Sequence, residues 1–107
     1  MNCWLVFVED CSRPCNCLSE HPLALSSNPG IAEGDYVIVV DEEMRTPCCI
    51  AVINNVKSSR INEELRVYAY LKDCDVPSGD FMNRIMKVIR SVGYVKIMNV
   101  NQHLCAK

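Results

Sequence analysis

The chain of 107 residues carries a net charge of −2, and half of its residues are hydrophobic. This length and composition suit one apolar core, and they exclude both two separately folding halves and a disordered, highly charged chain. We therefore predict one compact domain over residues 1–107. No apolar run approaches the ~20 residues that cross a bilayer, so we expect no membrane span.

The first predicted element is a strand over residues 4–8, a continuous apolar run rich in β-forming residues. Such a run is typical of a strand buried on both faces, so we expect it at the centre of a sheet. Glu9 and Asp10 stop the run and no basic residue precedes it, which is not the pattern of a secretory signal. We therefore expect an intracellular protein, cytoplasmic or nuclear.

Residues 9–34 break the strand pattern, because they contain three prolines in turn-forming contexts. Long loops inside compact domains tend to be functional. This loop holds the sharpest chemical cluster of the sequence, Cys11, Cys15, Cys17 and His21. Thiolate and imidazole are usual ligands of structural zinc, but the C-x3-C-x-C spacing fits the paired spacing of known zinc sites poorly.

The chain has eight cysteines, of which Cys48 and Cys49 are adjacent within an apolar run. An even number suggests disulfides in a secreted chain, whereas a reducing compartment favours free thiols or metal ligands. Because we expect an intracellular protein, we interpret the cysteines first as free thiols, second as ligands of a zinc ion held in the loop, and third as disulfides. No other cofactor is expected.

Two dense β-forming runs follow, over residues 36–40 and 48–56, and the polar turn between them predicts a hairpin. Residues 57–62 read as a polar connection. Residues 65–71 then alternate in polarity, which predicts a fourth strand with one wetter face.

The second half continues with a strongly patterned amphipathic helix. Apolar residues recur at helical spacing from Phe81 to Val92, with Ser78 as N-cap and Gly93 as a left-handed C-cap. A last strand follows over residues 94–100. The predicted fold is α+β, a curved, mostly antiparallel five-stranded sheet or partly open small barrel in the order β-loop-β-β-β-α-β, with one C-terminal amphipathic helix.

Charge is distributed unevenly, since residues 1–54 hold eight acids and two bases while residues 55–107 hold five acids and nine bases. Basic side chains on the helix and just after it are candidates for contacts with a phosphate backbone: Arg84, Lys87, Arg90 and Lys96. The same residues suit a solvated helix face, which is the interpretation we favour.

Part of the chain resembles a known family. The opening Trp4-Leu5 strand, the variable loop, the Gly34-Asp35 step into a strand and the return strand over residues 49–56 resemble the EVE branch of the PUA-like fold. The resemblance implies a small β-barrel that binds RNA or modified DNA bases in an aromatic and polar pocket. It implies that Trp4 and the loop over residues 9–34 border that pocket. Independently of the resemblance, four aromatic residues could build a pocket wall, although buried aromatics most often fill a core: Trp4, Tyr36, Tyr68 and Tyr70.

No nucleotide-binding or hydrolase motif is present, and neither His21 nor His103 stands in a recognisable catalytic motif. We therefore do not expect an enzyme. Strands rich in β-branched residues have edges that pair with other strands, which favours a protein-interaction or dimerisation module that self-associates as a homodimer or binds a protein partner. The alternative is a nucleic-acid-recognition module of PUA-like type.

Overall fold

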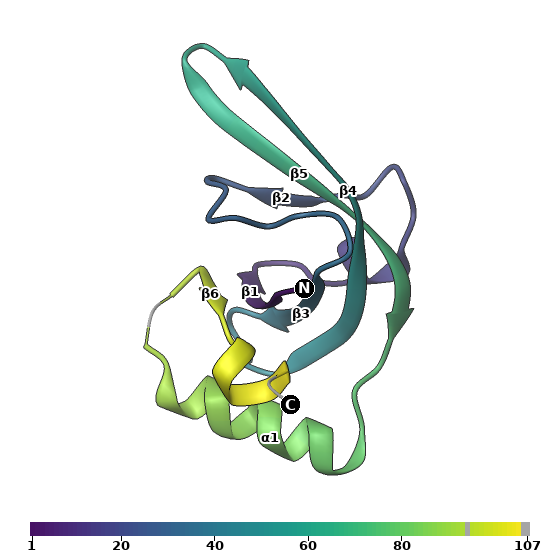
Figure 1. The fold of residues 1–107 in the computed structure, drawn as a ribbon, viewed down its shortest axis with the longest axis vertical. Coiled ribbons are helices and arrows are strands. Elements are labelled where there is room, and N and C mark those ends of the chain that lie inside the picture. The colour runs from purple at the N-terminus through teal and green to yellow at the C-terminus, as the bar shows by residue number, and fades with distance from the viewer. Residues whose placement is uncertain (94, 106–107) are drawn as a thin grey trace.

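A computed structural model describes residues 1–93 and 95–105. Within them, six strands accompany one α-helix and two short helical turns (Figure 1). In chain order the elements are β1 (Cys3–Val8), the 3-10 turn η1 (Pro14–Asn16), β2 (Leu23–Leu25), β3 (Tyr36–Asp41), β4 (Pro47–Ile61), β5 (Glu64–Asp75), α1 (Gly79–Ser91), β6 (Ile97–Asn99) and the π-helical turn η2 (Asn101–Cys105).

The strands form one curved, open sheet in the order β2-β5-β4-β3-β1-β6. Neighbouring strands are antiparallel except β1 and β3, which run parallel from Cys3↔Tyr36 to Val8↔Asp41. The predicted α+β class and the hairpin of β3 with β4 are confirmed. The prediction of five strands is wrong by one, because the long loop contributes β2, and the sheet does not close into a barrel.

Strand β1 is buried on both faces, as its sequence predicts, but it lies second from the end of the sheet, between β3 and β6, and not at the centre. Because successive side chains point to opposite faces of a strand, Trp4 and Val6 join one core cluster while Leu5 and Phe7 join another. The first cluster lies beneath the cysteine-rich loop, and the second is covered by α1 through Ile85, Val88 and Ile89. One sheet therefore carries an apolar core on each face.

Helix α1 begins where the sequence predicts and ends differently. Ser78 is the N-cap residue, although its side chain makes no capping hydrogen bond. Gly93 is not left-handed, and the C-cap is Val92 in an extended conformation. The guanidinium of Arg45 instead donates to the carbonyls of Ile89 and Val92 at 2.8 and 2.9 Å. An arginine from the β3–β4 turn thus satisfies carbonyl groups at the helix end, whereas a left-handed glycine motif satisfies such carbonyls with backbone N–H groups.

Replacing Arg45 by alanine is expected to lower the free energy of unfolding by about 1–2 kcal/mol, because two carbonyls at the helix end lose their charged donor. Urea denaturation followed by circular dichroism measures the change. Lys87→Ala is the matched control, since Lys87 is exposed on the same helix and should change stability by less than about 0.5 kcal/mol. Equal effects of the two substitutions would contradict the capping role.

The β4–β5 hairpin projects from the body of the molecule and gives it a long axis of 42 Å against 27 Å in the other directions (Figure 1). Its tip is a two-residue turn in which Asn62 and Glu63 both have positive φ, the conformation of a type I′ hairpin. The predicted polar connection over residues 57–62 is wrong, because most of it is strand. Polar residues fit this ribbon since both of its faces meet solvent near the tip.

The cysteines form disulfides, which corrects two predictions. Among the described residues, Cys11–Cys48, Cys15–Cys49 and Cys17–Cys74 tie the loop after β1 to β4 and β5, with Cα–Cα distances of 5.8–6.3 Å. The free-thiol interpretation is therefore wrong, and so is the intracellular location. Disulfides persist in oxidising compartments, so three of them in a domain of this size indicate an extracellular or otherwise oxidising environment.

The C-terminal segment departs from the prediction in length. Strand β6 covers Ile97–Asn99 instead of residues 94–100, and Tyr94 lies outside the described residues. The turn η2 follows β6. Within residues 1–93 and 95–105, no helix is long and apolar enough to span a bilayer.

Candidate functional site

An open groove of about 680 Å³ lies at the foot of the projecting hairpin. One wall comes from residues 64–68 of β5 and residues 24–27 in and after β2. The other wall comes from residues 6–9 at the end of β1, from Glu42, and from Lys96 and Ile97 at the start of β6. The groove therefore forms where the two ends of the sheet face each other without pairing.

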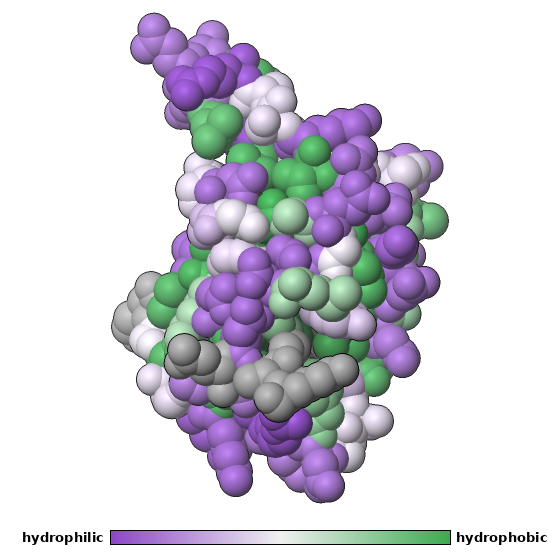
Figure 2. Space-filling view, in the orientation of Figure 1, coloured by the Kyte–Doolittle hydropathy of each residue, from purple (hydrophilic) through white to green (hydrophobic). Residues whose placement is uncertain are grey.

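The floor of the groove is apolar. Val6 belongs to the core cluster beneath it, and the half-buried Leu25 and Ile97 pack against that cluster. Val67 is buried in the groove wall as well. At the lip, Leu65 is 37% exposed. Figure 2 shows hydrophobic surface at the foot of the hairpin with hydrophilic residues around it. Apolar surface surrounded by polar residues is a common feature of sites where proteins contact partners.

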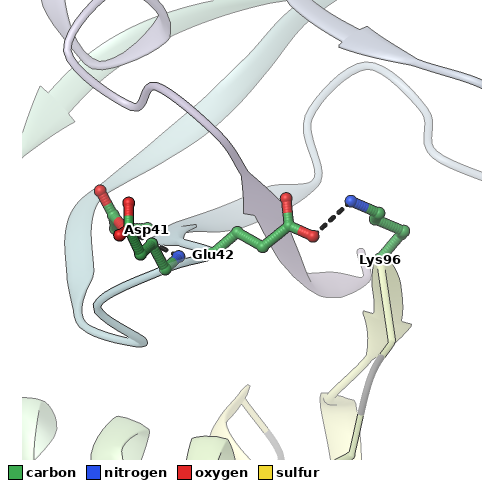
Figure 3. Close-up of polar contacts among 4 residues, drawn as sticks. Asp41, Glu42 and Lys96 are labelled. Atoms are coloured by element: carbon green, nitrogen blue, oxygen red, sulfur yellow. Dashed lines mark hydrogen bonds and ion pairs between the residues drawn. The ribbon is translucent and has the colours of Figure 1, made fainter.

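Charged residues of both signs form the rim: Glu9, Glu42, Glu64, Arg66 and Lys96. Lys96 pairs with Glu42, which joins the start of β6 to the turn after β3 (Figure 3). Arg66 pairs with Glu64 at 3.2 Å on the hairpin. Both pairs are solvent-exposed, so each contributes at most about 1 kcal/mol and is easily exchanged for a charge on a ligand.

Free strand edges border the groove. Strands β2 and β6 end the sheet order, so within residues 1–93 and 95–105 each has one edge without a neighbouring strand. The N–H of Phe7 donates to the carbonyl of Lys96, and the N–H of Val100 donates to the carbonyl of Cys3. Because bonding direction alternates along a strand, Ile97 and Asn99 point their backbone groups away from β1. These groups are available to an added strand.

The structure does not bring together all six residues of the nucleic-acid hypothesis, because only three of them share one element, helix α1. Trp4 is only 4% exposed, and its indole N–H donates to the carboxylate of Asp35 at 3.0 Å. Tyr36 is 40% exposed at the start of β3. Of the three basic residues on the exposed face of α1, Arg84 donates to the carbonyl of Leu104 at 3.1 Å. Lys87 and Arg90 stay exposed on that helix, and Lys96 lies on the groove rim.

The proposed zinc ligands are arranged as a disulfide-bonded loop. Cys11, Cys15 and Cys17 are each bonded to another cysteine, so none offers a thiolate to a metal. The imidazole Nδ1 of His21 lies 3.0 Å from the side-chain amide of Asn16. In the part of the chain that the structure describes, no group of three or more His, Cys, Asp or Glu residues could hold a metal ion. The zinc hypothesis has no support in this arrangement.

Sequence reasoning singled out Lys96 on the groove rim but did not single out the apolar residues of the floor. Ala24 and Leu25 lie in the loop that was expected to lack strands, and Leu65 and Val67 were recognised only as part of an alternating strand. The available signal was the short apolar run Leu23–Leu25 between two polar stretches. This run predicts a strand only weakly, and it does not indicate which segment lies opposite that strand across the groove.

Comparison with known proteins yields no match to a family model, to a curated protein or to a solved structure.

Proposed function

We propose that the chain is a non-catalytic protein-interaction module that binds an extended segment of a partner protein in the groove at the foot of the hairpin. The observation that carries the proposal is the combination of an apolar floor, a rim of both charges and a free β6 edge in one groove. An extended peptide can add backbone hydrogen bonds at such an edge while alternate side chains enter the floor.

A nucleic-acid ligand has less support from the same geometry. The groove rim carries three acids against two bases, which does not favour a polyanion. A base-stacking pocket needs an accessible aromatic face, and the indole of Trp4 is packed inside the core. Arg84, the helix base nearest the C-terminal turn, already has a carbonyl partner.

Selection of a random peptide library against the oxidised protein tests the proposal. We expect enrichment of peptides with apolar residues at alternate positions, and about tenfold weaker binding of these peptides to Ala24→Arg. Ala24 is exposed and lines the groove, so arginine there obstructs the site without entering the core. Isothermal titration calorimetry gives the dissociation constants.

Ala32→Arg is the matched control, because Ala32 is an exposed alanine that does not line the groove. It should bind the selected peptides as the original chain does. Selection that enriches no peptide, or peptides that bind Ala24→Arg and Ala32→Arg equally well, would reject the groove as the binding site.

A further inference from the structure

In the part of the chain that the structure describes, the outer edge of β4 has no neighbouring strand along the projecting half of the hairpin. The register of β3 with β4 ends at Tyr36↔Val52, whereas β4 continues to Ile61. Strand β5 pairs with the other edge of β4 from Asn55↔Tyr70 to Ile61↔Glu64 without a shift. Residues 56–60 therefore form a regular strand with one open edge.

The turn geometry determines which residues of this edge point outward. In a two-residue hairpin, the residues that flank the turn exchange both backbone hydrogen bonds, so Ile61 bonds with Glu64. Bonding direction alternates along the strand, which directs the N–H and C=O groups of Val56, Ser58 and Arg60 away from β5. Ser58 and Arg60 are exposed. Within the described chain, no hydrogen bond joins these outward groups to another segment.

We propose that this edge pairs with the same edge of a second copy of the chain, antiparallel, about a two-fold axis through Ser58. In this register Ser58 faces Ser58 of the other copy, and Val56 faces Arg60. Each of these outward-directed pairs exchanges two N–H···O=C bonds. The two hairpins then form one continuous four-stranded ribbon, with β4 strands at its centre and β5 strands outside.

The side chains of this edge are self-complementary in that register. Lys57 faces Ser59 of the other copy, and Arg60 faces Val56, so no two like charges are directly opposite. A twofold axis at Arg60 would oppose two arginines. An axis at Val56 would run into the register shift between Ile53 and Asn55. Among the three residues whose backbone groups point outward, Ser58 is therefore the position of the two-fold axis that avoids both opposed like charges and the register shift.

A second copy also explains why the edge can stay open in one chain. An unprotected strand edge invites uncontrolled pairing, whereas a two-fold contact uses both edges and ends the assembly at a dimer. This surface is the β4 edge of the hairpin, and the groove borders the β5 side. The dimer is thus independent of the proposed peptide groove, and Ala24→Arg should leave it unchanged.

Substitutions at two neighbouring serines test the proposal, because they should change the dimer dissociation constant in opposite directions. Ser58→Glu and Ser58→Lys each place like charges face to face on the axis, so we expect dimer dissociation constants raised about tenfold or more. Ser59→Glu faces Lys57 of the other copy, so we expect a dissociation constant lowered a few-fold. Both serines are exposed, so the variants should fold, and circular dichroism is the measurement that checks it.

Sedimentation equilibrium of the intact, oxidised protein over a concentration series measures these constants. The original chain should sediment as a dimer at high concentration. A monomer at every concentration would overturn the proposal. Equal weakening by Ser58→Glu and Ser59→Glu would overturn it too, because the register through Ser58 requires opposite effects.

Discussion

Replacing Cys15 and Cys49 together by alanine is expected to lower the free energy of unfolding by about 4 kcal/mol, which is a large share of the 5–15 kcal/mol typical of a small domain. The disulfide joins residues 34 positions apart, so its loss releases the unfolded chain from a long closed loop. Cys49 is also 2% exposed and belongs to the core beneath the loop, so packing is lost as well. Guanidinium denaturation measures the change.

The Cys11–Cys48 bond is the matched comparison, because it joins residues 37 positions apart from the same loop to the same strand. Its loop-closure contribution is nearly equal, but Cys48 is only half-buried. Removal of this pair should therefore destabilise the protein by less than removal of the Cys15–Cys49 pair. Losses below about 1 kcal/mol for both pairs would contradict the view that disulfides hold the loop after β1.

Local periodicity explains what the sequence predicted well. The apolar run of β1, the two runs of β3 and β4, and the helical spacing of α1 each report the burial of their own residues. Such patterns identify an element and the face it buries. They identified five of the six described strands, the helix and the α+β class, although the bounds of β4, β5 and β6 differ from the predicted ones.

Pairing between segments that are distant in the chain explains what the sequence did not predict. Cysteine connectivity depends on which segments meet in space, and eight cysteines allow many pairings. Because we expected a reducing compartment, we placed disulfides last among the three interpretations of the cysteines. The wrong inference about the compartment therefore led to the wrong interpretation of the cysteines. The projecting half of the hairpin was missed for a different reason, because a solvated two-stranded ribbon has no apolar face to produce a pattern.

The site was less predictable than the fold. The groove is assembled from the ends of β1 and β6, from β2 and from β5, which are far apart in the sequence and carry no shared motif. Trp4 was expected at a pocket wall, and instead it donates a hydrogen bond within the core to Asp35, the residue that follows Gly34 at the entry to β3.

Replacing Asp35 by alanine is expected to lower the free energy of unfolding by about 3–5 kcal/mol. Its buried carboxylate accepts hydrogen bonds from the backbone of Asn2, the indole of Trp4 and the backbone of Ala32, each at 3.0 Å. Truncation leaves these donors without their charged acceptor. Trp4→Phe removes one donor and keeps an aromatic ring, so we expect a loss of about 1–3 kcal/mol in urea denaturation. An equal loss in both variants would contradict the role of Asp35 as the shared acceptor.

Asp35 should also make stability depend on pH in acid. Burial raises the pKa of its carboxyl, but the hydrogen bonds from Asn2, Trp4 and Ala32 outweigh it and hold the pKa below the ordinary value of 3.8. A carboxyl whose pKa is lower in the folded state stabilises the protein above its unfolded pKa, and this stabilisation is lost as pH falls through the folded pKa. Asp35→Asn removes the titrating group, so its unfolding free energy should fall less between about pH 6 and pH 2 than that of the original chain. Parallel acid profiles for the two proteins would show that the carboxylate at the entry to β3 does not contribute in its charged form.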